Sequence, residues 1–287
     1  MLTAMERLRS TLDYADEDIA VLEDLAEDVA ASDTLLVTGS SLTGLSRKQA
    51  DLDLLVLGSK ACHLSTHAAS LHGATRARYR LPNMRHVTMR YVGADTLHAL
   101  KERVQRTQDG FRVPSLLVGA PRLTLDDQIL LHEIKDGLIV CNSSIAEQWR
   151  HALHSDSLPL MLAANRLSRY AARRINAEHF AVCGESQSAQ WCMREALEEL
   201  LAAYLAAFGR TNPRKRWHLL LLERLDCIRA EQAGRLAALL SAPLPGTSDL
   251  SETLSVVDAV LREITAQLPV LGNLGGFLPH SFERGLE

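Results

Sequence analysis

The sequence lacks the cysteine pattern of a disulfide scaffold or of a zinc site. Its five cysteines are odd in number and form no Cys-x-x-Cys pair. Isolated thiols of this kind are typical of a reducing compartment, where most of them pack in the core as small apolar side chains. We therefore expect free thiols and a cytoplasmic protein.

Long uncharged apolar runs are also absent, so no membrane-spanning helix is expected. Residues 1–16 contain no apolar segment of the kind that forms a secretory signal peptide. A basic excess is missing as well, since the formal net charge is −4 and the pI is near 6.3. General nucleic-acid binders usually carry a basic balance, and a nucleic-acid partner is therefore not expected.

The pattern of apolar residues changes along the 287-residue chain, which is long enough for one or two domains. Short alternating runs separate helical segments as far as residue 141, and only helical periodicity follows. This predicts an α+β domain over residues 1–141 and an all-α helical bundle over residues 142–287. The leucine-rich helices of the bundle could serve a homodimer as well as a core.

Two carboxylates stand at the start of the apolar strand that we expect over residues 51–57. Because side chains alternate across a strand, Asp51 and Asp53 share one face. Neighbouring carboxylates repel each other unless a cation lies between them. Mg²⁺, or Mn²⁺ in its place, suits such a pair because hard divalent cations prefer oxygen ligands. The pair therefore predicts a metal site.

A Gly39-Ser40 turn ends the apolar strand that precedes this pair. Glycine lets the backbone approach a ligand closely, and such a turn offers N–H groups and a hydroxyl to phosphate oxygens. We expect a phosphate-binding turn that faces the two carboxylates.

This turn, followed by Asp51-x-Asp53 within an apolar strand, resembles the signature of the nucleotidyltransferase superfamily, which has the polymerase-beta-like fold. The resemblance covers roughly residues 30–100, and a weaker likeness to the aminoglycoside nucleotidyltransferase branch extends through the helical half. It implies a mixed sheet in the first domain. It also implies an enzyme that moves a nucleoside monophosphate from a nucleoside triphosphate, with ATP expected, to a hydroxyl group of a small-molecule acceptor.

The resemblance implies contacts to the nucleotide from both halves of the chain. The basic residues before Trp217 resemble a helix start found after the long helix in nucleotidyltransferases with helical C-terminal domains. The expected nucleotide-binding residues are Gly39, Ser40, Ser41, Thr43, Arg47, Lys48, Lys215 and Arg216.

One departure concerns the third carboxylate that members of this superfamily place on a later strand. Two alternating segments, residues 75–81 and 85–92, predict a hairpin that contains that strand. Thr88 occupies the matching position, and His86 lies on the same face. His86 is a candidate general base, since its ordinary pKa is close to neutrality. In the aminoglycoside-like branch a helix supplies an acid as base, and Glu133 and Asp136 are the candidates here.

The missing carboxylate leaves other functions open. A second metal ion would be held weakly, so the protein could be a catalytically impaired relative that acts as a nucleotide sensor or an interaction scaffold. A transferase that modifies tRNA or protein would need a basic surface. Only Arg76, Arg78, Arg80 and residues 214–216 suggest one.

Overall fold

The computed structural model covers the whole chain and describes only part of it in detail. The described residues are 6, 8–9, 16–29, 31–39, 42, 51–58, 76–80, 86–112, 123–224, 230–241 and 250–272.

The chain forms two compact units, each built from two segments. The first unit is Met1–Arg106 with Ile129–Asp156, and the second is Thr107–Gln128 with Ser157–Glu287. The boundary expected between residues 141 and 142 therefore lies inside the first unit, and residues 107–128 belong to the second. That residues 1–141 and 142–287 are separate domains stays a prediction.

The first unit contains a five-stranded sheet with the order β3-β4-β2-β1-β5. Its central strand β2 pairs antiparallel with β1 and parallel with β4, so the sheet is mixed. The outer strands β3 and β5 pair antiparallel with β4 and β1, respectively. The strands are β1 (Thr34–Thr38), β2 (Leu52–Gly58), β3 (Arg76–Arg80), β4 (His86–Gly93) and β5 (Leu138–Cys141).

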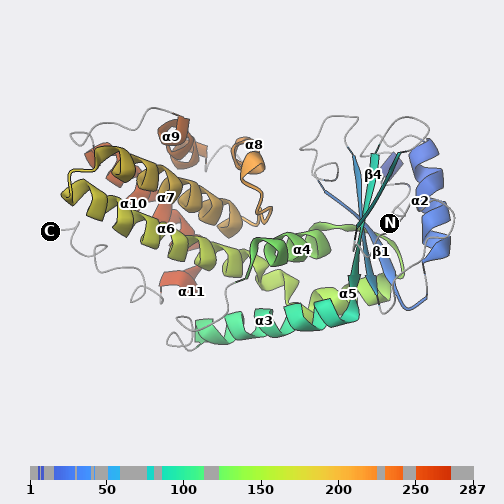
Figure 1. The fold of residues 1–287 in the computed structure, drawn as a ribbon. Helices are drawn as coiled ribbons and strands as arrows, with labels where there is room; N and C mark the ends of the chain where they lie inside the picture. Colours follow the sequence, from blue (N-terminus) through green and yellow to red (C-terminus); the bar gives the residue numbers. More distant parts are fainter. Residues whose placement is uncertain are drawn as a thin grey trace. The chain divides into compact units, whose positions relative to one another are not determined.

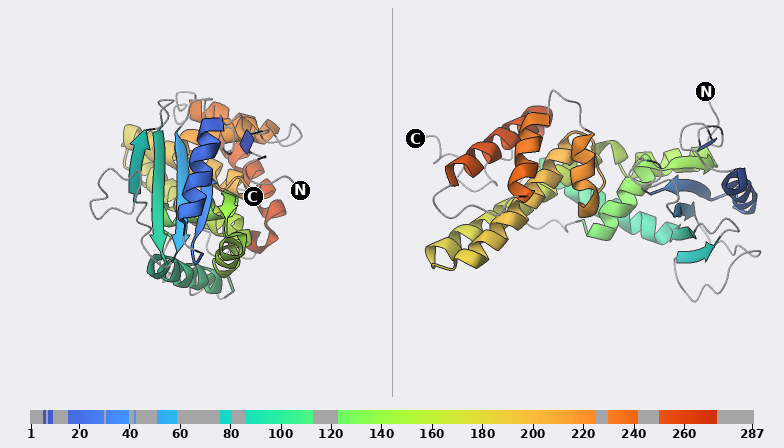
Figure 2. Two further views of the ribbon diagram at one scale, coloured as in Figure 1. Left: turned by 90° about the vertical axis from the view of Figure 1, so that its right-hand side faces the viewer. Right: turned by 90° about the horizontal axis from the view of Figure 1, so that it is seen from above.

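One face of the sheet is covered by α2 (Asp16–Asp28), as Figures 1 and 2 show. The apolar residues of α2 recur at helical spacing, and Ile19, Leu22 and Leu25 pack against alternate residues of the strands, among them Leu54 and Val87. The sheet contributes every second residue to this cluster because its other residues lie on the opposite face. Those other residues include the predicted metal ligand Asp53.

The opposite face is apolar at its centre, on β1 and β2, whereas β4 places His86, Thr88 and Arg90 on it. Leu36, Leu55 and Leu57 are each 0% exposed there. The last turn of α4 (Leu125–Asp136) lies beside this face, where Glu133 contacts Arg90 of β4. Arg150 caps that turn, donating from Nε to the Ile134 carbonyl oxygen at 2.9 Å and from Nη2 to the Gly137 carbonyl oxygen at 2.6 Å. The carbonyl groups that a helix end leaves unpaired are thereby satisfied.

Further helices are present in the described part of the chain. Their bounds are α3 (Ala94–Arg112), α5 (Ser143–Ala152), α6 (Leu158–Val182), α7 (Ser186–Ala207), α8 (His218–Glu223), α9 (Ala230–Ser241), α10 (Leu250–Gln267) and α11 (Pro269–Gly272).

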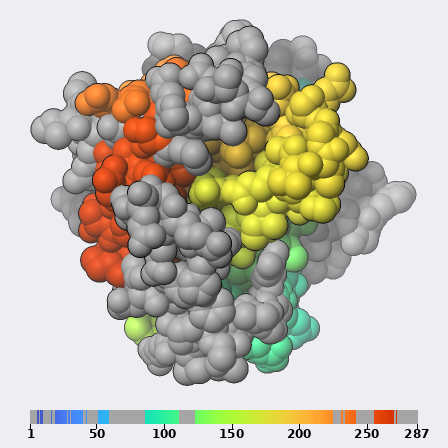
Figure 3. All heavy atoms as spheres, turned by 90° about the vertical axis from the view of Figure 1, so that its left-hand side faces the viewer, coloured from blue at the N-terminus to red at the C-terminus, as the bar shows by residue number. Residues whose placement is uncertain are grey.

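The second unit is organised around an antiparallel pair, α6 and α7, which Figure 1 shows lying side by side. Leu197, Leu200 and Tyr204 of α7 are each 0% exposed, which agrees with the apolar periodicity of that segment. The turn that joins the two helices lies at the face drawn in Figure 3, where both helices are yellow. No helix in the described part of the chain is long and apolar enough to cross a membrane.

The α+β class with a mixed sheet and a helical C-terminal region is confirmed. The hairpin expected over residues 75–92 is also confirmed, since β3 and β4 pair antiparallel.

Candidate functional site

The candidate site lies where β1 ends and β2 begins. Asp51 immediately precedes β2 and Asp53 is its second residue, and both are half-buried. Asp53 is the register partner of Thr38, the last residue of β1. The Thr38 hydroxyl donates to the Asp53 carbonyl oxygen at 3.3 Å, which fixes the backbone that carries the carboxylate. The acid is therefore positioned by a central strand with a neighbour on each side.

Gly39 packs directly against the Asp53 side chain. Its φ is +86°, a left-handed conformation that glycine adopts without a steric cost. A Cβ atom added at Gly39 would lie 2.9 Å from the Asp53 Cβ and 3.0 Å from its Cγ, closer than real Cβ atoms approach. The glycine turn and the carboxylate are thus in contact, which is the arrangement expected of a phosphate-binding turn beside a metal ligand.

We expect Gly39→Ala to reduce binding of Mg²⁺ and ATP, because the new methyl group displaces the Asp53 carboxylate. The backbone strain alone costs about 1–2 kcal/mol. Gly184→Ala is the matched control, since Gly184 has a φ of +78° and nothing within 4 Å of an added Cβ. Urea unfolding should show a loss of stability in both variants, and calorimetry should show weakened binding only in Gly39→Ala. Equal binding by the two variants would contradict the assigned contact.

Thr88 is the register partner of Asp53 on β4. Residues in register on adjacent strands share a face, so Thr88 stands in the row where the superfamily would place its third carboxylate. His86 is the first residue of β4 and is half-buried. Continuing the parallel register by one residue from the Leu52–Val87 pair would place His86 level with Asp51. The structure therefore brings both predicted positions to the carboxylate pair.

Glu133 lies on the same side of the sheet and binds an arginine that sequence analysis did not single out. Arg90 Nη1 lies 3.3 Å from Glu133 Oε2, and the two side chains are only 19% and 11% exposed. Arg90 lies on the Asp53 face, because its register partner on β2 is Leu55. An acid already bound by a guanidinium is poorly placed to collect a substrate proton. Arg90 could have been noticed in the sequence, because it is a charged residue within a strand whose other residues alternate between apolar and polar.

Asp136, the alternative to Glu133, is a weaker candidate for a base. Burial raises the pKa of this carboxyl, but hydrogen bonds and charge from His132 and Lys135 outweigh it and lower the pKa to about 2. The His132 Nδ1 atom lies 3.1 Å from Asp136 Oδ2, and Lys135 Nζ lies 2.8 Å from Oδ1. A general base works best when its pKa is near the operating pH. Asp136 therefore suits a structural role at the end of α4 better than a catalytic one.

Several expected nucleotide contacts lie outside the described residues, namely Ser40, Ser41, Thr43, Arg47 and Lys48. Lys215 and Arg216 are described and belong to the second unit. Lys215 Nζ lies 2.6 Å from Glu198 Oε2, and the Arg216 guanidinium lies 4.9 Å from the centre of the Trp217 ring. Each basic group thus has a neighbour in its own unit, and its contact with a nucleotide stays a prediction.

A hard divalent ion needs several oxygen ligands, and the residues at the start of β2 supply part of such a set. Among the residues that the structure describes, no group of three or more His, Cys, Asp or Glu side chains could hold a metal ion. The pair Asp51 and Asp53 supplies carboxylate oxygens from adjacent positions. Mg²⁺ is often bound by one or two carboxylates together with substrate phosphates and water. The residues therefore fit an ion that arrives with a polyphosphate.

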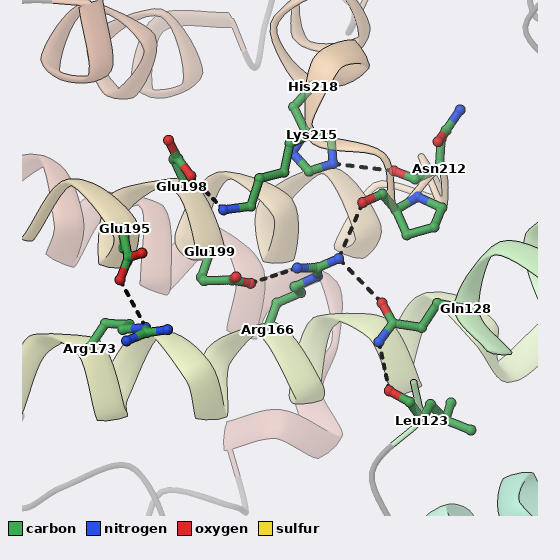
Figure 4. A network of polar contacts seen from close by, with 11 residues as sticks. Leu123, Gln128, Arg166, Arg173, Glu195, Glu198, Glu199, Asn212, Lys215 and His218 are labelled. Atoms are coloured by element: carbon green, nitrogen blue, oxygen red, sulfur yellow. Dashed lines mark hydrogen bonds and ion pairs between the residues drawn. The ribbon is translucent and has the colours of Figure 1, made fainter. Parts of the chain in front are cut away.

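A second polar cluster is buried in the second unit and joins α6, α7 and the start of α4 (Figure 4). Arg166 of α6 is 4% exposed, and its Nη1 donates to Glu199 Oε2 of α7 at 2.8 Å. Its Nη2 donates to Gln128 Oε1 and to the Pro213 carbonyl oxygen, each at 3.3 Å. His218 lies beside this pair and donates from Nε2 to the Asn212 carbonyl oxygen at 3.3 Å. Every group in the cluster has a partner, which is typical of a structural network.

Acid is expected to destabilise the second unit through His218. Burial, and then the charge of Arg166, lower the pKa of this imidazole from 6.5 to about 4. Below pH 6.5 His218 binds a proton in the unfolded chain but not in the folded protein. The free energy of unfolding therefore falls as the pH drops towards 4. The loss should reach up to about 3 kcal/mol.

Urea unfolding at a series of pH values measures this effect. His218→Gln should flatten the decline between pH 6.5 and about 4. His179→Gln, a change at an exposed histidine of the same unit, should keep it. A decline of the same size in both variants would assign the acid sensitivity to other groups.

Neither a protein-family model nor a curated protein matches this sequence.

Proposed function

We propose that the first unit is a nucleotidyltransferase-type domain that binds a nucleoside triphosphate, with ATP expected, together with Mg²⁺. The observation that supports this best is the contact between Gly39 and the Asp53 carboxylate. A glycine turn lies against an acid suited to a metal ion, and that acid stands on the central strand of a mixed sheet. The Asp51-x-Asp53 spacing also supports it, whereas Thr88, in register with Asp53, departs from the superfamily pattern.

In this proposal the two aspartates bind the Mg²⁺ of the nucleotide, which neutralises phosphate charge when bound. The Gly39–Ser41 turn would bind the β- and γ-phosphates through backbone N–H groups and hydroxyls, and Thr43, Arg47 and Lys48 would add further contacts. Phosphoryl-group transfer requires mainly positioning and charge stabilisation, and these residues supply both.

The reaction joins an acceptor hydroxyl oxygen to the α-phosphorus. The bond from that phosphorus to the bridging oxygen breaks, and pyrophosphate leaves with the bonding electrons. His86 takes the hydroxyl proton, because it lies at the same end of the sheet as Asp51, whereas Glu133 is bound to Arg90. Glu133 then acts as a positioning residue for Arg90. The acceptor is a small molecule, in keeping with a net charge of −4.

A second candidate is favoured by Thr88. With a hydroxyl where a third carboxylate would stand, only one metal ion is held well, and the unit would bind a nucleotide without transferring it. Such a protein would be a nucleotide sensor or an interaction scaffold.

Titration calorimetry with Mg-ATP, together with a pyrophosphate-release assay across hydroxyl-bearing acceptors, tests the proposal. Binding with release in the presence of an acceptor supports the transferase. Binding without release across a broad set of acceptors favours the sensor. If none of the four nucleoside triphosphates binds, neither nucleotide function holds and an interaction scaffold is left.

A further inference from the structure

His179 and Cys183 form a pair of metal-ligating groups at the end of α6, in the second unit. Cys183 Sγ lies 3.9 Å from His179 Nε2, and both side chains are exposed. In a tetrahedral zinc site, bonds of about 2.3 Å to sulfur and about 2.0 Å to nitrogen place the two ligand atoms about 3.6 Å apart. The thiol and the imidazole therefore lie at nearly the separation of two ligands of one zinc ion.

The backbone that carries the pair belongs to a capped helix end. The Cys183 N–H donates to the His179 carbonyl oxygen at 3.0 Å, so the two residues stand one helical turn apart. Gly184 follows with a φ of +78°, and the Glu185 N–H donates to the Phe180 carbonyl oxygen at 2.9 Å, as in a Schellman motif. A helix C-terminus carries partial negative charge, which favours a cation there. The end of α6 thus presents both ligands on a fixed turn.

The pair supplies half of a tetrahedral site. A structural zinc ion takes four ligands, and within the described ranges no third His, Cys, Asp or Glu side chain groups with these two. One face of α6 carries, at helical spacing, Ile175, His179, Val182 and Cys183. Ile175 is 49% exposed and Val182 is 88% exposed, and Figure 3 shows this end of α6, drawn in yellow, at the surface. Exposed apolar side chains beside a ligand pair suit the approach of a second protein surface.

We propose that two copies of this chain bind one Zn²⁺ ion between them, each copy supplying Cys183 and His179. A twofold axis through the ion gives both copies the same contacts, because an isologous interface uses one patch twice. Two thiolates and two imidazoles make a closed tetrahedral site of the structural kind. Each thiol releases its proton to solvent as its sulfur binds the ion. The same contact covers Val182 and Ile175 of both copies, and it does not depend on the proposed nucleotide function.

Light scattering on the whole chain tests the shared site, with Zn²⁺ added to EDTA-treated protein in the presence of a phosphine reductant. The molar mass should double at one Zn²⁺ per two chains, and EDTA should reverse the change. Cys183→Ser and His179→Gln should each weaken Zn²⁺ binding about 100-fold or more, because every copy loses one of its two ligands. Cys183→His should keep the doubling, since an imidazole replaces the thiolate as a ligand.

The matched control is His151→Gln, which removes an exposed histidine from the last turn of α5, as His179→Gln does from the last turn of α6. It should leave Zn²⁺ binding and the doubling of mass unchanged. Co²⁺ in place of Zn²⁺ should give the visible absorption of a tetrahedral ion with thiolate ligands, and Cys183→Ser should abolish it.

Four outcomes would overturn the shared site. The first is that Zn²⁺ does not bind. The second is that each chain binds its own ion with no change in mass, which would assign the pair to a site closed by water. The third is that doubling persists in both Cys183→Ser and His179→Gln, which would place the ion elsewhere. The fourth is that dimers form only when the reductant is left out, which would indicate a disulfide between two Cys183 residues.

Discussion

The variant Asp51→Asn/Asp53→Asn is expected to lose the stabilisation that Mg-ATP should give to the first unit under the proposed function. A ligand at 100 times its Kd stabilises the folded state by about 2.7 kcal/mol. Asparagine keeps the shape of each side chain and removes its charge, so Mg²⁺ would lose the two anionic ligands proposed for it. Thermal unfolding with and without Mg-ATP measures the difference. Transfer activity should fall at least about 100-fold, the scale on which preorganised charge contributes to catalysis.

Glu27→Gln/Glu102→Gln is the control, because it removes the same charge from exposed positions on α2 and α3. It should keep the full shift with Mg-ATP. If the aspartate variant also keeps it, the metal site does not lie at β2.

A reciprocal variant probes the departure at Thr88. Because Thr88 is the register partner of Asp53, Thr88→Asp places a third carboxylate in the row where the superfamily has one. If the protein holds a single metal ion, the added carboxylate should strengthen Mg²⁺ binding and raise the rate of pyrophosphate release about 10-fold or more. Weaker Mg²⁺ binding in Thr88→Asp would show that the row is not a metal site.

The local arrangement of the candidate site follows from patterns that act over short distances. Alternation along a strand predicts that Asp51 and Asp53 share a face, and a glycine at a strand end predicts a backbone that can adopt positive φ. The structure agrees at Gly39, which packs against Asp53. Alternation also predicts β3 and β4 as a hairpin, since both partners lie within one short stretch of chain.

Contacts between distant segments could not be predicted in this way. Glu133 meets Arg90 because α4 follows the sheet on the Asp53 face, and nothing near either residue specifies the other. The antiparallel pairing of β5 with β1 likewise depends on how the whole unit closes. Arg166 did leave a signal. It stands on the apolar stripe of α6, four residues from both Leu162 and Tyr170, and a charge on such a stripe predicts a buried partner.

That partner makes Arg166→Met the most destabilising substitution we expect in the second unit. Glu199 is 8% exposed, and without the guanidinium it would be left as a buried charge with no opposite charge at its 2.8 Å contact. Removing one member of a buried ion pair typically costs about 3–5 kcal/mol. The same substitution also removes the donor that Gln128 Oε1 and the Pro213 carbonyl oxygen share. Urea unfolding, followed by the fluorescence of the tryptophans, measures the loss.

The same two helices provide the control. Arg173 of α6 lies 3.2 Å from Glu195 of α7, with side chains 48% and 31% exposed (Figure 4). Water already solvates this pair, so Arg173→Met should cost less than about 1 kcal/mol. Equal losses in the two variants would mean that the desolvation of Arg166 and Glu199 does not decide the stability.

A double substitution separates the pair from the fold that surrounds it. Arg166→Met/Glu199→Leu removes both charges together with the hydrogen bond between them, and it leaves Gln128 Oε1 and the Pro213 carbonyl oxygen without the Arg166 donor. If Arg166→Met is destabilising because the Glu199 carboxylate is left buried without an opposite charge, the double variant should regain most of the lost free energy of unfolding. Apolar replacements of a buried ion pair are often neutral. If the double variant is instead as unstable as the sum of both single variants, packing and not charge pairing holds α6 against α7.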